Sequence, residues 1–265
     1  MQLIGGTTPF FDPYGWTPEA GFDGALAALG WTSATSRGGT EAQALARLKA
    51  ALAEGPAWVG PVEMGHLRHQ PGKTGPIGAD HYVVVLEVGE TAVLMHDPES
   101  HPYATLPHAD FMAAWRAKTI DYATAYTMRT AFRQVAAVSA DDAVRAALPA
   151  AVEWLAARGD HDMPPGSLGN GEAAEALAAL IEAGCAPDLR DHLTGFAVRV
   201  GARRAADAAA CLARIGRSRA AEITVRQARL IGGLQHPLVI GDDAQAAAGL
   251  RALAPTYDDL LAALT

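Results

Sequence analysis

The segment HYVVVLEVGETAVLMHDP, residues 81–98, consists of two apolar runs joined by a short turn. β-Branched residues dominate the first run, and Gly89-Glu90 gives a two-residue connection of the kind that closes β-hairpins. In an antiparallel pair closed by this turn, His81 and Asp97 lie at nearly equal distances from it along the chain. The pattern therefore predicts a hairpin with His81 and Asp97 as neighbours across its open end.

Elements on both sides extend this hairpin into a sheet with helices. Before it, apolar positions spaced three, four and seven apart predict a helix over 40–52, which ends before Gly55-Pro56, and a strand over 57–63. After it, we expect a short helix over 106–115 and a half-buried strand over 119–128, where apolar and polar residues alternate. The first half is therefore predicted to be α+β with an antiparallel sheet.

The second half, from about residue 136, has the periodicity of helices. Its amphipathic stretches cover 172–183, 189–200, 203–215 and 257–264, and the first three are predicted to end at Gly184, Gly201 and Gly216. We therefore predict two domains, an α+β domain over 1–132 and an all-α domain over 133–265.

Composition excludes several classes of protein. The chain has 265 residues, of which half are hydrophobic, and a formal net charge of −8, which argues against a general nucleic-acid binder. It has no apolar run long enough for a membrane span and no secretory signal pattern, so we expect a cytoplasmic protein without membrane contact. The two cysteines, Cys185 and Cys211, cannot form a disulfide framework and are expected to be reduced and buried.

The predicted neighbours His81 and Asp97 could do chemistry. An aspartate beside a histidine fixes the imidazole tautomer and stabilises its protonated form, as in Cys/Ser-His-Asp systems. The alternative is a histidine that begins a strand and an Asp-Pro turn in which Asp97 caps a loop.

Four short motifs follow one another along the first half. They are Pro61-Val62-Glu63, HYVVV at 81–85, HDP at 96–98 and a helix after Leu106-Pro107. Their order resembles the N-terminal domain of the butirosin biosynthesis protein H family and, more distantly, the papain-like peptidases that process double-glycine bacteriocin leaders. From about Gly166 to YDDLL at 257–261, the second half resembles the helical domain that follows in the butirosin family. The resemblance covers nearly the whole chain and implies a papain-like first domain.

The resemblance implies an acyltransferase of specialised, antibiotic-type metabolism that needs no cofactor. Members of that family move an acyl group from an acyl-carrier-protein thioester to an amine of an aminoglycoside. His81 carries over as the general base and Asp97 as its orienter. We therefore expect a small-molecule amine or peptide substrate, with an acyl carrier protein as a possible partner, or a related amide or thioester hydrolase.

The nucleophile of the family does not carry over. In these folds a cysteine precedes a glycine-rich segment that corresponds here to 3–6, and this sequence begins at Met1, after its expected position. Three interpretations stay open: the start is displaced and a preceding helix with its cysteine is missing; His81 deprotonates an amine or water directly; or the protein is an inactive relative that binds a pathway intermediate, antibiotic or carrier protein. Thr7 and Thr8 lie nearest the expected nucleophile segment.

The loop after the strand over 57–63 supplies further candidates. The family arrangement implies that Glu63, Met64 and His66 line the acceptor pocket, where Glu63 would suit a cationic amine. The alternative is an exposed polar loop. Together with Glu63, the histidines at 66, 69, 96 and 101 are residue types that zinc accepts, but their spacing matches no zinc motif, so no metal is predicted.

Arginines are concentrated in the second half. Eight of them lie between Arg199 and Arg229. A basic face there could dock an acidic carrier protein. The alternative, which we favour, is an ordinary solvated helical face.

Overall fold

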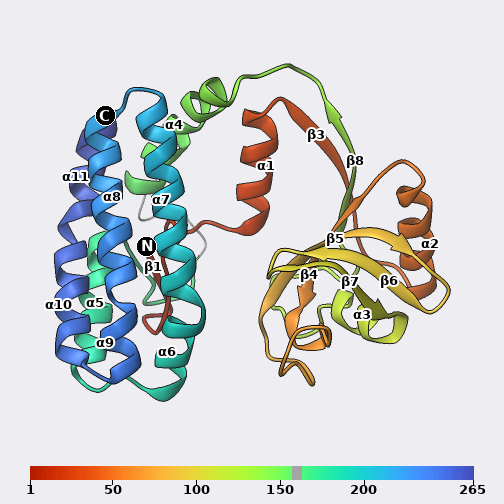
Figure 1. The fold of residues 1–265 in the computed structure, drawn as a ribbon, viewed down its shortest axis with the longest axis horizontal. Helices are drawn as coiled ribbons and strands as arrows, with labels where there is room; N and C mark the ends of the chain where they lie inside the picture. The colour runs from red at the N-terminus through yellow and green to blue at the C-terminus, as the bar shows by residue number, and fades with distance from the viewer. Residues whose placement is uncertain (157–162) are drawn as a thin grey trace. The chain divides into compact units, whose positions relative to one another are not determined.

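The hairpin around Gly89 supplies two inner strands of a six-stranded antiparallel sheet in the computed structural model, which describes residues 1–156 and 163–265 (Figure 1). The strand order is β3-β8-β4-β5-β6-β7. The strands are β3 (Trp31–Ser36), β4 (Ala57–Glu63), β5 (Asp80–Val88), β6 (Ala92–Asp97), β7 (His101–Pro107) and β8 (Met128–Gln134). The predicted antiparallel sheet is confirmed, although β3 and β7 were not predicted as strands.

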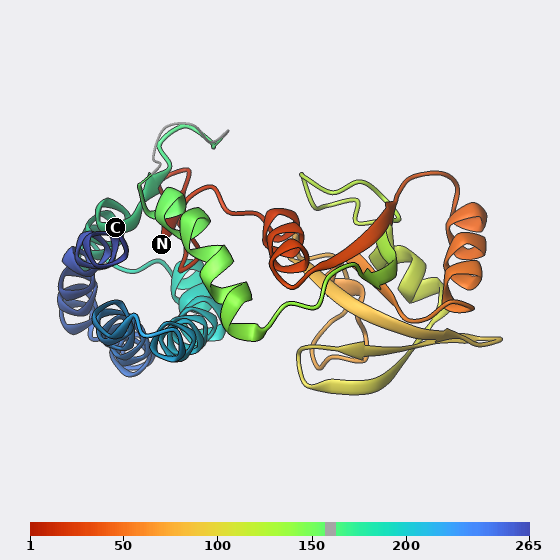
Figure 2. The ribbon, with the colours of Figure 1, turned by 90° about the horizontal axis from the view of Figure 1, so that it is seen from above.

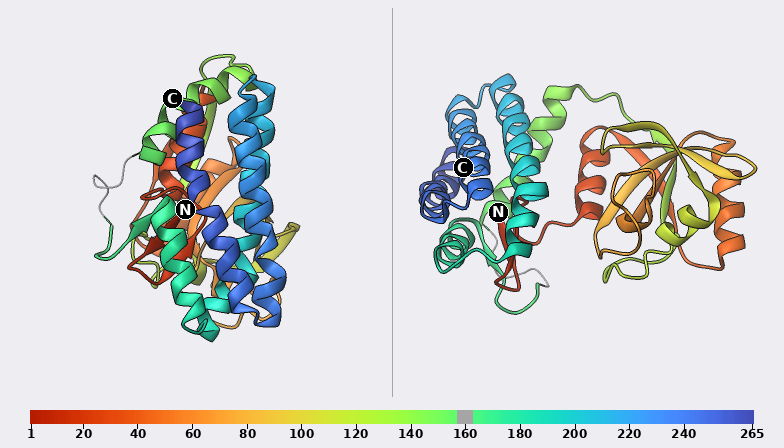
Figure 3. Two further views of the ribbon diagram at one scale, coloured as in Figure 1. Left: turned by 90° about the vertical axis from the view of Figure 1, so that its left-hand side faces the viewer. Right: turned by 60° about the horizontal axis from the view of Figure 1, so that its bottom comes forward.

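Alternation along the strands gives the sheet a buried face. Val83, Val85 and Met95 have no exposed surface, and Val85 pairs with Met95 across the hairpin. Two helices, α2 (Glu41–Leu52) and α3 (His108–Trp115), contribute residues to the same apolar cluster. Figure 3 shows the ribbon of this sheet and its helices from two further sides. Both helices confirm predictions, and α2 begins with the predicted threonine cap. Successive side chains of a strand point to opposite faces of the sheet. His81 lies two residues from Val83, and Asp97 lies two residues from Met95, so both are on this buried face.

The strand predicted over 119–128 is wrong. Residues 119–127 form turns, and β8 begins only at Met128. Ala117 and Tyr126 have positive φ angles of 48° and 58°, and the Tyr126 N–H donates to the Trp115 carbonyl at 3.0 Å. Tyr126 is buried against the Trp115 ring, with 5.6 Å between centroids. Tyr126 is thus buried by a loop, whereas Tyr122 of the same alternating series is exposed, so the alternation did not mark one face of a strand.

The second half is helical, as predicted. Its helices are α4 (Ala140–Ala156), α5 (Asn170–Glu182), α6 (Pro187–His192), α7 (Val198–Arg214), α8 (Ser218–Gly233), α9 (Gln235–Ile240), α10 (Asp243–Leu253) and α11 (Pro255–Leu264). A π-helical segment, η2 (Leu193–Ala197), interrupts the helix predicted over 189–200. Gly201 does not end a helix, because it lies inside α7. A side chain there would overlap Phe11, so the glycine permits close packing of the N-terminal segment.

The first residues pack with these helices. By contacts, Met1–Leu29 and Ala137–Thr265 form one compact unit, and Gly30–Ala136 forms the other. The N-terminal elements are β1 (Gln2–Ile4), β2 (Thr8–Phe10) and α1 (Pro18–Ala28), and β1 pairs with β2 and with β9 (Leu168–Gly169). Figure 2 shows the N-terminus beside the helices of its unit, where Met1 and Leu3 are buried among α5 and α10 residues. The domain division at 132/133 stays a prediction.

Candidate functional site

The ends of two neighbouring strands bring His81 and Asp97 together. His81 is the second residue of β5, and Asp97 is the last residue of β6. The Glu99 N–H donates to Asp97 Oδ1 at 2.8 Å, which closes the turn after the strand in the manner of an Asx turn. The His81 Nε2 lies 2.7 Å from the same oxygen. The hairpin register therefore delivers the expected juxtaposition, whereas a catalytic role for the two residues stays a prediction.

Asp97 is the centre of a wider cluster. Its side chain is fully buried, and its second oxygen, Oδ2, lies 2.7 Å from His69 Nε2 and 2.7 Å from Gln70 Nε2. An ionised carboxylate only accepts hydrogen bonds, so both histidines donate to it from Nε2. Four N–H donors thus surround one buried carboxylate, which is the arrangement that a buried charge requires.

These donors keep Asp97 ionised. Burial alone would raise the pKa of the Asp97 carboxyl group. The hydrogen bonds from His81, Gln70 and the Glu99 N–H outweigh burial and hold this pKa well below its ordinary value. Asp97 therefore carries a full negative charge at neutral pH.

The two histidines differ in what their other ring nitrogen can reach. Because His81 donates from Nε2, its Nδ1 is the nitrogen that can accept a proton. In the described part of the chain this Nδ1 has no hydrogen-bond partner, and unlike the Nδ1 of His69 it is not enclosed. The His81 side chain is 13% exposed. An imidazole held at Nε2 by a carboxylate can act as a base at Nδ1, and this role for His81 and Asp97 stays a prediction.

Sequence reasoning missed the second half of this cluster. His69 and Gln70 come from the loop that follows the 3₁₀ turn η1 (Met64–His66), and this loop has no periodicity that would orient a side chain. His69 entered the sequence analysis only as a residue type that zinc accepts. The position of this loop was a usable signal. The loop follows β4, and the last residues of β4 pair with the start of β5, where His81 lies.

Glu63 anchors the same loop. It is buried, and its carboxylate accepts hydrogen bonds from the N–H groups of Gly65 at 3.1 Å, Ile77 at 2.9 Å and Gly78 at 3.1 Å, and from the Thr119 hydroxyl. Burial would raise the pKa of Glu63, but the Thr119 hydroxyl and these N–H groups hold it below its ordinary value. Protein donors thus occupy both oxygens of Glu63, and its expected contact with a substrate amine stays a prediction.

The other predicted binding residues lie in different surroundings. Met64 and His66 form the η1 turn and are half-buried. Thr7 and Thr8 are exposed in the β1–β2 hairpin, which belongs to the unit of Met1–Leu29 and Ala137–Thr265. Their role in binding a substrate stays a prediction.

The cysteines are not fully buried, which corrects the expectation from sequence. Both are free and partly exposed. Cys185 follows the end of α5, where burial raises the pKa of its thiol, so the thiolate is disfavoured. Cys211 lies in α7 at a partly exposed position next to the buried Leu212.

The zinc-type side chains are used in other ways. The Tyr103 N–H donates to His96 Nδ1 at 3.2 Å, and the two rings stack edge to face. Within residues 1–156 and 163–265, no group of three His, Cys, Asp or Glu side chains is arranged to hold a metal ion. No helix in those ranges is long and apolar enough to cross a membrane.

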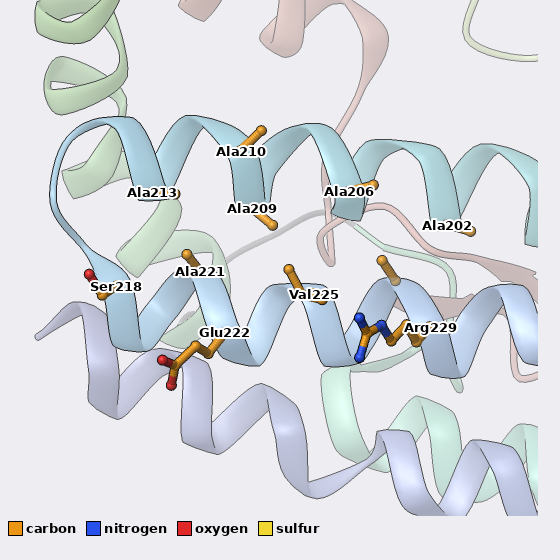
Figure 4. Close-up of a pocket in the computed structure, with 11 residues that line it drawn as sticks. Ala202, Ala206, Ala209, Ala210, Ala213, Ser218, Ala221, Glu222, Val225 and Arg229 are labelled. Carbon is orange, nitrogen blue, oxygen red and sulfur yellow. The ribbon is translucent and has the colours of Figure 1, made fainter.

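A groove of about 700 Å³ runs between α7 and α8 (Figure 4). Alanines of α7, among them Ala206 and Ala213, face Ala221 and Val225 of α8, and Arg229 stands at one edge. Ser218 and Glu222 also line the groove, but most of its lining consists of alanine methyl groups, which carry no charge and donate no hydrogen bond.

Part of the arginine concentration is used inside its own unit. Arg204 pairs with Asp12 and lies over the Trp16 ring, 5.3 Å from its centroid. Arg214 pairs with Asp141. These arginines hold the N-terminal segment and α4 to α7, which is a structural use.

Comparison with known proteins finds similarity in the helical part. Residues 164–265 match the family model described as the YobF C-terminal domain. The chain is also 29% identical over 106 residues to the uncharacterized protein YobF of Bacillus subtilis (strain 168). That alignment covers 40% of the chain and 34% of the relative, so the chain spans about a third of the length of the curated relative it matches.

Proposed function

We propose that this protein is an acyl-transfer enzyme with a papain-like first domain, which moves an acyl group from a carrier-protein thioester to an amine. The observation that carries the proposal is the hydrogen bond of 2.7 Å between His81 Nε2 and the buried Asp97, which leaves His81 Nδ1 as a proton acceptor. A related thioester or amide hydrolase would use water in place of the amine. The motif resemblance supports the substrate class.

The chemistry needs one base and one proton donor. As the amine nitrogen attacks the thioester carbonyl, His81 Nδ1 takes its proton, and the negative charge of Asp97 stabilises the imidazolium. When the carbon–sulfur bond breaks, the proton passes from Nδ1 to the departing thiolate. The products are an amide and a free thiol, and His81 returns to its neutral form. Residues 30–136 contain no cysteine, so the simplest course within this unit is attack by the acceptor itself.

An acidic carrier protein would need a basic surface. Arg219, Arg226 and Arg229 of α8 make no ion pair in the described part of the chain and are exposed. These cations could attract an acidic carrier before its thioester reaches the base. Weaker turnover at high salt with a carrier-bound donor, but not with a small thioester, would support this partner.

A direct test substitutes the base. In His81→Gln the amide nitrogen can still donate to Asp97, so the fold should persist, but no proton acceptor remains. With a small acyl thioester as donor and an aminoglycoside amine or water as acceptor, we expect turnover to fall by about 100-fold or more. Mass spectrometry of the product gives the rate, and His236→Gln, at an exposed position, is the control.

Undiminished turnover in His81→Gln would refute the proposal. An acyl group found covalently on the protein would instead show that a nucleophile precedes the transfer. The thermal midpoint of each variant, measured alongside, separates loss of chemistry from loss of fold.

A second candidate function is that of a non-catalytic binding protein. The absence of a cysteine from the unit that holds His81 favours it. A binder would be stabilised by its ligand, whether an intermediate, an antibiotic or a carrier protein, and would form no product after long incubation.

A further inference from the structure

Asp97 is shared between two imidazoles that lie in unlike surroundings. His69 is 9% exposed, whereas His81 is 13% exposed, and the more telling difference concerns Nδ1. The His69 Nδ1 is buried and has no hydrogen-bond partner in the described part of the chain. The rings of His69 and His101 pack edge to face, with 5.5 Å between their centroids.

The contacts of His69 give it a different role from His81. Its Nε2 donates to Asp97 Oδ2, so Nδ1 is the only ring nitrogen left to meet another group. That Nδ1 is enclosed, whereas the Nδ1 of His81 is not. His69 therefore contacts Asp97 without an open nitrogen, and His81 has both the contact and the open nitrogen.

We propose that His69 is a positioning residue for the reaction: its Nε2 holds Oδ2 of Asp97 in place and so keeps Oδ1 directed at His81. The inference rests on the proposed acyl-transfer function. Oδ1 can meet His81 only in one orientation of the carboxylate, and His69 and Gln70 fix that orientation from the other side.

Other ionisable groups at the cluster are few. They are Glu99 after β6, His101 at the start of β7, and the pair formed by Arg68 and Asp110 at 3.6 Å beside the loop. Asp97 alone among these charged groups is hydrogen-bonded to both imidazoles. The hydrogen bond made by His81 should therefore respond to the orientation of Asp97 first.

The test reads each imidazole directly in the full chain. With ¹⁵N-labelled histidine, NMR distinguishes a hydrogen on Nε2 from one on Nδ1 and reports on the hydrogen bond that it makes. We expect the Nε2–H of both His69 and His81 to show a hydrogen bond to a carboxylate. Substitution of His69 identifies its signals, and His81→Gln identifies those of the base.

Two variants then separate positioning from packing. His69→Met fills similar space without a donor, whereas His69→Gln keeps an N–H near the position of Nε2. We expect His69→Met to shift the Nε2–H signal of His81 and to reduce kcat with a small acyl thioester by about tenfold, with KM nearly unchanged, because Asp97 is released. His69→Gln should restore most of both, and His236→Met, in α9, is the control for substitution itself.

The outcomes are separable from those of the proposed function. If the wild-type protein shows no thioester turnover but His69→Met shifts the Nε2–H signal of His81, acyl transfer is refuted and the positioning of Asp97 by His69 stands. If His69→Met leaves that signal and kcat unchanged in a folded protein, the inference is overturned.

Discussion

At the residue scale, Asp97 couples folding to pH. Its pKa in the folded protein lies below the ordinary value of 3.8, because the hydrogen bonds it accepts outweigh the effect of burial. The unfolded chain therefore binds the proton more tightly, and Asp97 contributes its full stabilisation above about pH 5. This contribution is lost as the pH falls through 3.8 towards the lower pKa of the folded state.

We therefore expect Asp97→Asn to lower stability at pH 7 by about 1–3 kcal/mol, since an amide cannot accept all four hydrogen bonds. The variant should also lose less stability than the wild type between pH 5 and pH 3. Urea unfolding at a series of pH values measures both effects, with the exposed Asp188→Asn as control. Parallel pH dependence in Asp97→Asn and wild type would contradict the assignment of this linkage to Asp97.

The same residues show how far a sequence can define a site. His81 and Asp97 could be paired in advance because a short turn brings the two strands of a hairpin side by side. The ladder closes at Val88 and Val93 rather than directly around Gly89-Glu90, and its register shifts between Val85 and Glu87. His69 could not, because it lies in a loop between Glu63 and Gly78 whose path depends on hydrogen bonds to a buried carboxylate. Such contacts between distant residues leave no spacing pattern in the sequence.

At the scale of elements, the η1 turn packs closely at Gly65 against a later part of the loop that follows it. A side chain at Gly65 would overlap the carbonyl oxygen of Gly75 and lie 2.8 Å from its carbonyl carbon. Both obstacles are backbone atoms, so no side-chain rotation relieves them. The turn and the strand end at Glu63 could then no longer keep their positions together.

Gly65→Ala should accordingly destabilise the unit of Gly30–Ala136 by about 1–3 kcal/mol, as overpacking does elsewhere. Gly75→Ala is a matched control from the opposite side of the contact, because a side chain there meets nothing within 4 Å. Denaturant unfolding of the two variants gives the comparison. Equal free energies of unfolding would show that the loop adjusts freely, and that the close packing of Gly65 does not limit stability.

Elements differ in how well their sequences reveal them. The helix α2 and the hairpin of β5 and β6 were predictable because local rules, a cap and a turn, agree with their burial pattern. The segment 119–127 was not, because Tyr126 is buried by a loop with a positive φ rather than by a strand. The alternation in this segment does not follow burial either, since Tyr122 is exposed whereas Tyr126 is buried.

At the scale of the whole molecule, each compact unit has its own buried core. The core of Gly30–Ala136 contains Phe111 and the strand residues packed on it. The core of the other unit includes Leu3 from the N-terminal strand, which is buried among residues of α5 and α10. Residues far apart in sequence thus complete the helical core.

Two separate cores predict two unfolding transitions. Leu3→Ala should destabilise the helical unit by about 2–5 kcal/mol, because it leaves a cavity in a fully buried position, and Phe111→Ala should destabilise the sheet unit by about 3–5 kcal/mol. Each variant should shift one calorimetric transition and leave the other near its wild-type temperature. Hydrogen exchange followed by mass spectrometry assigns each transition, since peptides from β5 and from α10 report on different cores. A single transition that both substitutions lower equally would mean that the two cores unfold as one, and a change at Leu3 would then also disturb the hydrogen bonds around Asp97.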